Sequence, residues 1–398
     1  MRRLAYIFER FPSFTQTFCY REVVELQRQG IIPAIFSVRR PANEPAQDWD
    51  AAIVRQVEYL PGDEQLVREV DRATLKGKLP ETAAGEIAAW GRNTDFLRLY
   101  QAAWLGPRLQ ALGVRHVHAH FAGLAARTAY WIGRFFGISF SFTAHANDIF
   151  APKPFEISLG KMIAAARAVV TVSEFGVRFL EAKYPEHSGE THRVYNGIDL
   201  SRFQPADFSA APPVIVSIGR LIEKKGFQDL IQACRLLRER GMEFRCEIIG
   251  EGPLESALRE QIATLGLTNW IALTGPLPQE AVVKRLAGST LFALPCVTEA
   301  TGGMDNLPTV VMEAMAAGLP VVSTPIGGVP EMVQTEVTGF LVPEHQPPAL
   351  ADAFARILAD HCLAQSLGQA GRKRAMELFS IEKTAHDLRD LFQRLVAL

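Results

Sequence analysis

Two acidic residues eight positions apart, Asp305 and Glu313, are the first candidates for chemistry in this sequence. Pro308 suits the first turn of a helix and Gly318 suits its end, so a helix is predicted over 308–317. If all the intervening steps were helical, the two carboxylates would lie about 12 Å apart, beyond the roughly 5–9.5 Å of a glycosidase pair. Hydrolysis by the pair is therefore disfavoured. The remaining interpretations are ligands for a substrate, or a helix cap for Asp305 and a solvated position for Glu313.

Basic residues follow a predicted strand at 214–220. This strand ends in Gly219 and Arg220, and Lys225 comes shortly before the next helical stretch. Two cations near the backbone amides of a helix are what a diphosphate requires. A solvated basic loop is the alternative.

Two glycines, Gly250 and Gly252, follow the next strand, 246–250, and would allow a ligand to approach the backbone closely. The pattern does not continue to a dinucleotide fingerprint, because Glu255 stands where the third glycine is needed. This difference argues against a dehydrogenase.

Three histidines, His116, His118 and His120, alternate along a predicted strand and therefore share one face. Their Cα atoms would lie about 6.6 Å apart along a line, which is poor geometry for a compact metal site. Core or solvent positions are expected for the first two. His120 alone lies at the carboxyl end of the strand, where parallel α/β sheets bind their ligands.

Further polar residues follow two other strands of the N-terminal half. His145 and Asp148 come after the strand 141–145. Ser13 and Thr15 lie at the start of a helix that could hold an anion with its amides and hydroxyls, and plain helix capping is the competing account.

Strands and helices alternate along the whole chain, which predicts parallel sheets with crossover helices. We expect two doubly wound, Rossmann-like α/β domains that face each other across a crevice. The expected divisions are a domain over 1–203, a linker over 204–213, a domain over 214–376, and a helix over 377–398 that docks back, most simply on the first domain. The expected strands are 4–8, 34–38, 117–121, 141–145, 168–172 and 192–196, then 214–220, 246–250, 271–275, 291–295, 320–324 and 339–342.

Composition excludes several classes of protein. The chain has 398 residues and a net charge of −1, so no overall field would hold it to nucleic acid. Its five cysteines form no C-x-x-C pair, which fits a reducing cytoplasm. No signal peptide or membrane span is expected, so contact with the inner face of the cytoplasmic membrane would be peripheral. The aromatic stretch 90–108 is expected to pack in the core, and a surface for a lipid-linked partner is the minority interpretation.

Taken together, the motifs resemble those of the family 4 retaining glycosyltransferases of the GT-B fold. In the C-terminal half the resemblance rests on SIGRLIEKKGFQDLI, IIGEGPLESAL, DNLPTVVMEAMAAGLPVVSTPIGGVPEMV and TGFLVP. In the N-terminal half it rests on FPSFTQTF, VHAHFAG, SFTAHANDIF and VYNGID, which look like members that build bacterial surface polysaccharides of the colanic-acid type. The resemblance implies that the C-terminal domain binds a nucleotide-sugar donor and the N-terminal domain binds the acceptor.

The resemblance also assigns roles to residues. It implies that Asp305 positions the donor sugar, with Glu299 as the alternative because Asp305 is shorter than the family's Glu. It implies that Glu313 holds the ribose, that Arg220 and Lys225 neutralise the diphosphate, and that His120 lies beside the donor sugar. The family's N-terminal glycine-rich loop is replaced here by FPSFTQT. Further substrate-binding residues are expected at Gly219, Gly250, Gly252, Asn306, Leu307, Thr309, Ser13, Thr15, His145, Asp148 and Asn196.

The expected activity is transfer of a hexose from a nucleotide diphosphate sugar to a polysaccharide or lipid-linked oligosaccharide precursor. Retention of configuration is expected, with no metal and no cofactor. Two alternatives stay open on the sequence: a sugar-nucleotide 2-epimerase of the same fold, and a non-catalytic nucleotide-binding subunit of a transferase complex.

Overall fold

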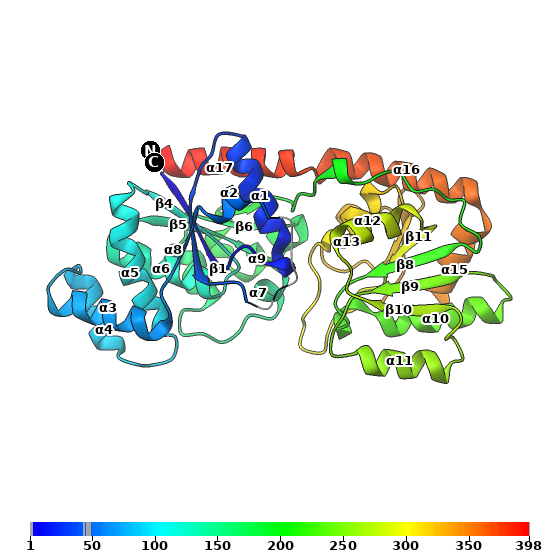
Figure 1. Cartoon of the computed structure of the whole chain (residues 1–398), viewed down its shortest axis with the longest axis horizontal. Helices are drawn as coiled ribbons and strands as arrows, with labels where there is room; N and C mark the ends of the chain where they lie inside the picture. The colour runs from blue at the N-terminus through cyan, green and yellow to red at the C-terminus, as the bar shows by residue number, and fades with distance from the viewer. Residues whose placement is uncertain (1–2, 43, 45–48, 398) are drawn as a thin grey trace. The chain divides into compact units, whose positions relative to one another are not determined.

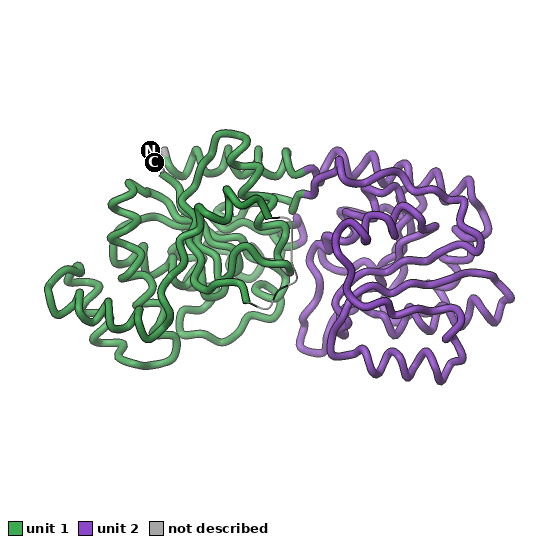
Figure 2. The backbone as a smooth tube through the Cα atoms, in the orientation of Figure 1, with its two compact units in different colours: residues 1–172, 176–197, 381–398 green, residues 173–175, 198–380 purple. Residues whose placement is uncertain are grey.

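The computed structural model of the chain describes residues 3–42, 44 and 49–397. The chain forms two compact units, which Figure 2 distinguishes by colour. The first unit comprises Met1–Val172, Gly176–Gly197 and Ile381–Leu398, and the second comprises Ser173–Phe175 and Ile198–Ser380. Among the described residues, no helix combines the length and the apolar character needed to cross a bilayer.

A parallel sheet of seven strands forms the centre of the first unit, in the order β3-β2-β1-β4-β5-β6-β7. Figure 1 labels β1, β4, β5 and β6 of this sheet. The order reverses between β1 and β4, and such a switch point is where open α/β sheets bind ligands. The strands are β1 (Leu4–Arg10), β2 (Ala34–Arg39), β3 (Val57–Tyr59), β4 (His116–His120), β5 (Ser139–Ala144), β6 (Ala168–Thr171) and β7 (Thr191–Arg193).

Apolar runs explain why these segments form the interior of the sheet. The first five residues of β1, Leu4–Phe8, are all buried, because helices cover both faces of the sheet. All six strands expected in this half are present. The edge strand β3 was not predicted, since its three residues, Val-Glu-Tyr, are too few for a periodic signal.

The helices of the first unit flank the sheet. The C-terminal helix α17 packs against α1, and its residues Leu388, Leu391 and Phe392 share one core with Tyr6 and Val23. The helices are α1 (Thr17–Arg28), α2 (Ala51–Val54), α3 (Asp63–Leu75), α4 (Glu81–Trp90), α5 (Leu97–Ala111), α6 (Leu124–Phe136), α7 (Ala146–Phe150), α8 (Leu159–Ala165), α9 (Glu174–Lys183) and α17 (Ile381–Ala397).

The aromatic stretch on α5 packs inside this unit. Tyr100 and Trp104 are buried, and they donate hydrogen bonds to Asp71 at 2.8 Å and Glu69 at 2.7 Å on α3. These contacts favour the core interpretation of the stretch over a lipid-facing surface.

A second parallel sheet, of six strands, forms the centre of the second unit, in the order β10-β9-β8-β11-β12-β13. Its order reverses between β8 and β11. The strands are β8 (Val214–Ile218), β9 (Arg245–Ile249), β10 (Ile271–Gly275), β11 (Leu291–Leu294), β12 (Val321–Ser323) and β13 (Gly339–Leu341). The prediction of doubly wound α/β architecture is confirmed in each unit.

The helices of the second unit include α13, which begins at Thr309, one residue after the start predicted from the sequence. The segment expected as a linker is bonded to this unit, because the amides of Ala206 and Asp207 donate to carbonyls of Ala317 and Ala287. The helices are α10 (Phe227–Glu239), α11 (Glu255–Thr264), α12 (Gln279–Ala287), α13 (Thr309–Ala316), α14 (Val329–Met332), α15 (Pro347–Ala359) and α16 (His361–Leu378).

Candidate active site

Two loops of the second unit meet at the switch point of its sheet. One follows β8 and contains the 3₁₀ turn η4 (Glu223–Lys225), and the other follows β11 and contains Asp305. The carboxylate of Asp305 accepts from the ammonium group of Lys225 through Oδ2, and its Oδ1 lies 3.3 Å from Nζ of Lys224. The Cys296 thiol lies 3.6 Å from Oδ2. The loops therefore bring one carboxylate and two lysines together.

All four groups are largely removed from water, and their charges support one another. Burial alone would raise the pKa of Asp305, but Lys225 and Lys224 hold it below its ordinary value. Burial would lower the pKa of Lys225, but the Asp305 carboxylate raises it. Burial raises the pKa of the Cys296 thiol, which is therefore neutral. The exposed Arg220 lies close enough for its charge to act on Lys225.

Glycine at position 226 permits this arrangement. Gly226 has a φ of 66°, and a Cβ atom there would lie 1.7 Å from the carbonyl oxygen of Pro295, directly after β11. Only glycine combines this conformation with so close an approach. The turn that carries Lys224 and Lys225 can therefore lie against the end of the neighbouring strand.

The glycines predicted for the nucleotide side lie at the ends of β8 and β9. Gly250 has a φ of 144°, and a Cβ atom on it would lie 2.0 Å from the carbonyl oxygen of Gly219. At Gly252 an added Cβ would meet the backbone of Leu221 at 2.6 Å. The structure thus uses these glycines to pack two loops together, whatever ligand they also accept.

The remaining residues predicted around the donor lie on or just before α13. Glu313 is buried inside the helix, and the amide of Gln279 approaches its Oε1 at 3.4 Å. Asn306 is also buried, and it accepts a 2.5 Å hydrogen bond from the hydroxyl of Ser173. Leu307 is buried and Thr309 half-buried.

Glu299, the alternative to Asp305, is half-buried in the same loop. Its backbone amide bonds to the carbonyl oxygen of Gly303 at 2.8 Å. The lysine contacts described above belong to Asp305.

A second cluster lies in the first unit, at the carboxyl ends of β4 and β5. His120 ends β4, and its Nε2 lies 3.0 Å from Oε1 of Glu22 on α1. The hydroxyl of Tyr6 donates to the same oxygen at 2.5 Å. The Nδ1 of His120 lies 3.4 Å from Nε2 of His145, which directly follows β5. His120 is only 1% exposed, whereas His145 is half-buried.

The other histidines of β4 are held by hydroxyls of β5. His116 contacts Ser139 at 2.9 Å and Ser141 at 2.7 Å. His118 contacts Ser141 at 2.8 Å and Thr143 at 3.0 Å. Burial lowers the pKa of His116 to about 3. Both rings are therefore satisfied core histidines, which agrees with the expectation for them.

One group within the described part of the chain has the spacing of a metal site. Ligand atoms of Glu22, His118 and His120 all lie within 4.8 Å of one another. However, both ring nitrogens of His118 are occupied by hydroxyls, and Tyr6 donates to the Glu22 oxygen. A cation would have to break these bonds, so the donor set fits a hydrogen-bonded network better than a metal.

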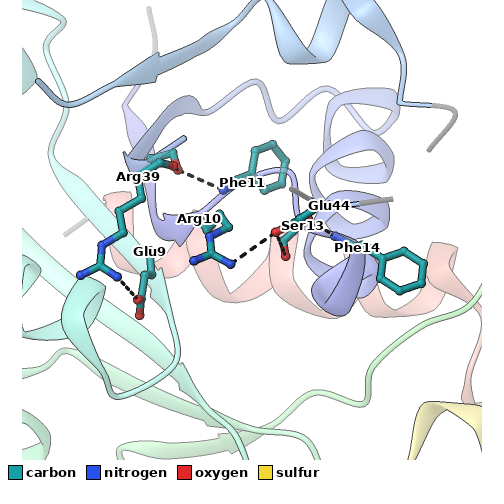
Figure 3. A network of polar contacts seen from close by, with 8 residues as sticks. Glu9, Arg10, Phe11, Ser13, Phe14, Arg39 and Glu44 are labelled. Atoms are coloured by element: carbon teal, nitrogen blue, oxygen red, sulfur yellow. Dashed lines mark hydrogen bonds and ion pairs between the residues drawn. The ribbon is translucent and has the colours of Figure 1, made fainter. Parts of the chain in front are cut away.

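The loop after β1 carries the predicted anion site. Figure 3 shows Ser13 and Phe14 turned toward Glu44, whose carboxylate accepts from the Ser13 hydroxyl at 3.1 Å and the Phe14 amide at 2.7 Å. Arg10 lies 3.4 Å from the same carboxylate. This helix start therefore already holds an anionic group from the chain itself. The side chain of Thr15 lies outside the described residues.

The last two predicted residues also lie near the carboxyl ends of strands of the first unit. Asp148, on α7, accepts from the backbone amide of His145 at 2.9 Å. Burial raises the pKa of Asp148 to about 6, against the lowering effect of hydrogen bonds from backbone amides. Asn196 is half-buried, shortly after β7.

The predicted residues thus divide between the two units. Arg220, Lys225, Asp305 and Glu313 belong to the second unit, and the histidines belong to the first. The structure adds partners that the sequence did not single out: Lys224, Cys296 and Glu22. Lys224 is adjacent to Lys225 in the sequence. Glu22 lies 98 positions from His120, and no spacing rule connects them.

Comparison with known families agrees with this division. Residues 15–202 match the model described as Glycosyltransferase Family 4, and residues 201–374 match the model described as Glycosyl transferases group 1. The two matches meet near the boundary between the units.

Curated relatives include glycosyltransferases named for the biosynthesis of colanic acid and of amylovoran. The chain is 40% identical over 204 residues to a putative colanic acid biosynthesis glycosyltransferase of Escherichia coli, and the match covers 50% of each chain. It is 38% identical over 201 residues to an amylovoran biosynthesis glycosyltransferase of Erwinia amylovora, which covers 50% of this chain and 49% of that one. The matches thus span about half the length of these curated relatives.

Solved structures share the fold over nearly the whole chain. A glycosyltransferase from Rickettsia africae aligns with a TM-score of 0.73 and 17% identity, covering 98% of both chains. A sucrose-phosphate synthase from Thermosynechococcus elongatus aligns with a TM-score of 0.74 and 19% identity, covering 100% of both. With two family models that together account for residues 15–374 and this shared fold, the chain belongs to the family 4 glycosyltransferases of GT-B architecture.

Proposed function

We propose that the protein transfers a hexose, with retention of configuration and without a metal ion, from a nucleotide diphosphate sugar to a saccharide acceptor. The observation that carries the proposal is the group of Lys225, Lys224 and Asp305 at the switch point of the second sheet, with Arg220 beside it. The switch point is where open α/β sheets bind nucleotides. The family membership makes a sugar nucleotide the natural ligand.

In this proposal, cations perform the task that a divalent metal performs in other transferases. Arg220 and Lys225 stabilise the charge that develops on the departing diphosphate, which is the largest electrostatic change in the reaction. Asp305 orients the donor sugar, and Glu313 binds the ribose. The leaving phosphate takes the proton of the acceptor hydroxyl, which attacks from the same face.

For the acceptor, we propose a precursor of a bacterial surface polysaccharide, free or lipid-linked, bound by the first unit. Relatives named for colanic acid and amylovoran biosynthesis support this class of acceptor. Ser13, His145, Asp148 and Asn196 are the proposed contacts. We further propose that the reaction takes place at the cytoplasmic face of the inner membrane, through peripheral contact.

A thermal-shift panel of UDP, GDP, ADP and their sugars, with and without EDTA, tests the donor site. We expect one base to raise the melting temperature regardless of EDTA, since a ligand at 100 times its Kd stabilises by about 2.7 kcal/mol. The double variant Arg220→Ala/Lys225→Ala should lose the shift. The control variant Arg259→Ala/Lys284→Ala, which changes exposed cations of the same unit, should keep it.

Transfer itself is then measured with the stabilising donor and a panel of saccharide acceptors. NMR of the product's anomeric proton should show the configuration of the donor sugar. An inverted product, or a shift that disappears with EDTA, would contradict the retaining or the metal-independent part of the proposal.

A further inference from the structure

The three histidines that cluster beside α1 are not equivalent in charge. Burial and the charge of His120 lower the pKa of His118 and of His145 well below the ordinary value. For His120, burial acts in the same direction, but the adjoining Cys19 and Glu22 side chains raise its pKa well above that value. The cluster therefore holds one imidazolium, His120, between two neutral rings.

Glu22 is the counter-charge of this imidazolium. Cys19 also contacts His120 and contributes to the rise in its pKa, although burial raises the pKa of the Cys19 thiol itself above its ordinary value. The remaining ionisable side chains that face the ring are Tyr6, whose pKa burial and Glu22 raise, and the two neutral histidines. The geometry places the Glu22 carboxylate directly against the ring, with Oε1 3.0 Å from Nε2 of His120.

An imidazolium at His120 determines the hydrogen bonding of its neighbour. Both ring nitrogens of His120 then carry protons, so Nε2 donates to Glu22 and Nδ1 donates to Nε2 of His145, 3.4 Å away. A neutral His120 could donate only one of these bonds. The charge on His120 therefore makes Nε2 of His145 the acceptor and selects the tautomer of that ring that carries its proton on Nδ1.

His120 itself is enclosed by its own unit. The rings of Phe8, Phe18 and Phe121 lie with their centroids 5.5, 6.2 and 6.5 Å from the His120 ring, and Tyr6 stacks at 5.9 Å. His145 is the half-exposed member of the pair, at the carboxyl end of β5. Glu22 could therefore affect a substrate only indirectly, through its contact with His120 and the contact of His120 with His145.

We infer that Glu22 is a positioning residue: it holds His120 as an imidazolium, and His120 in turn orients His145 at the carboxyl edge of the first sheet. The inference rests on the proposed function only where it predicts an effect on turnover. The hydrogen-bond network itself can be tested without any substrate.

The first measurement is long-range ¹H–¹⁵N NMR of the full chain labelled with ¹⁵N-histidine, with the His120 signals assigned from His120→Gln. We expect the wild type to show an imidazolium at His120 at pH 7.5 and Glu22→Gln to show a neutral ring. Glu25→Gln is the matched control, because Glu25 is equally buried on the same helix but pairs with Gln29 and Arg28. It should keep the imidazolium, and so should Cys19→Ala; loss of the imidazolium in Cys19→Ala but not in Glu22→Gln would assign the counter-charge to Cys19 and overturn the inference. A neutral His120 in the wild type, or an imidazolium that survives in Glu22→Gln, would overturn the inference.

The second measurement is the pH profile of kcat and KM with the donor that the thermal-shift panel identifies. We expect Glu22→Gln to lower kcat by about tenfold to a hundredfold at pH 7.5 with little change in KM. The loss should shrink as the pH falls, because acid restores the proton on His120, and Glu22→Asp should recover most of the activity. A uniform loss across the pH range would indicate a merely structural role and contradict the inference. A wild type that shows the imidazolium but transfers no sugar would instead contradict the proposed function alone.

Discussion

The ammonium group of Lys225 donates directly to the carboxylate of Asp305, so two residues to which the family resemblance gives separate roles form one charged pair. Lys224 lies against the other oxygen of the same carboxylate at 3.3 Å. Two lysines thus share one aspartate in a largely buried place, and these three groups together carry one net positive charge. A diphosphate would complete the neutralisation, because each additional phosphate oxygen can accept from a cation already held in position.

Replacing Asp305 with Asn should destabilise the protein yet strengthen its response to nucleotide. The side chains of Lys224 and Lys225 are 7% and 13% exposed, and the substitution removes the carboxylate that both nearly buried cations contact. We expect the free energy of unfolding of the second unit to fall by about 3 kcal/mol. The added nucleotide diphosphate should then raise the melting temperature by more than it does in the wild type.

The control for this change is Asp352→Asn, which breaks an exposed ion pair with Arg240 and should cost at most about 1 kcal/mol. Asp305→Glu keeps the charge and should restore most of the stability. A nucleotide response that is smaller in Asp305→Asn than in the wild type would show that Asp305 supports the diphosphate rather than balancing the lysines.

Glu313→Gln should raise the KM for the donor and change kcat less. The side chain is buried on α13, and loss of its charge weakens bonds to the ribose hydroxyls in the ground state and the transition state alike. Hydrogen bonds to a charged group contribute about 1.5–3 kcal/mol, so KM should rise roughly tenfold to a hundredfold. Steady-state kinetics measures this, with the exposed Glu280→Gln on α12 as control. A fall in kcat at constant KM would assign Glu313 to the chemical step.

Gly250→Ala should cost far more stability than an alanine at another glycine of positive φ. The new Cβ would lie 2.0 Å from the carbonyl oxygen of Gly219, so the ends of β8 and β9 would have to separate. We expect a loss of about 3 kcal/mol or more. Gly241, with a φ of 75° and nothing within 4 Å of an added Cβ, should lose only about 1–2 kcal/mol as alanine. Denaturant titration of both variants makes the comparison, and equal losses would mean that the close approach is relieved by small shifts.

Periodic signals account for the parts of the fold that were predictable. Apolar runs such as Leu4–Phe8 and helix-start residues such as Pro308 are signals within a short stretch of sequence. They therefore locate the strands and the start of α13 to within a few residues. The edge strand β3 was not predicted, because its three residues, one of them charged, are too few to show an alternating apolar pattern. The hydrogen bonds of Ala206 and Asp207 to the second unit were not predicted, because the Pro/Ala-rich composition around these residues is typical of a linker.

The contacts within the candidate site were less predictable from the sequence than the fold. Motifs in the sequence indicated Lys225 and Asp305 separately. Their direct contact across 80 positions depends on two features of the fold: β8 and β11 are neighbours in the sheet, and Gly226 lets the lysine turn lie against the end of β11. Glu22 gave no signal at all, because a glutamate in an amphipathic helix is by default solvated. Its burial against His120 depends on how α1 packs on the sheet, which no short-range pattern encodes.

The histidines His116 and His118 of β4, and His145 directly after β5, should make the first unit sensitive to mild acid. His116, with its pKa lowered to about 3, and His118 and His145, lowered well below the ordinary value, are neutral when folded but bind protons below about pH 6.5 when unfolded. Their contribution to stability is therefore present above pH 6.5 and lost as the pH falls. Asp148 has the opposite effect, because its pKa is raised to about 6 in the folded state. Between pH 6 and the pKa of an unfolded aspartate, the folded protein binds this proton and the unfolded chain does not, so Asp148 adds stability as the pH falls. His120, protonated in both states in this range, adds no slope.

Because three histidines oppose one aspartate, we expect a net loss of stability as the pH falls from 6 to 4. Urea titrations followed by tryptophan fluorescence measure it, because Trp90, Trp104 and Trp131 lie in the first unit. His116→Gln removes one titrating group and should reduce the slope by about 1.4 kcal/mol per pH unit. His361→Gln, at an exposed position of the second unit, should leave it unchanged. An unaltered slope in His116→Gln would show that this ring is not held neutral by the sheet around it.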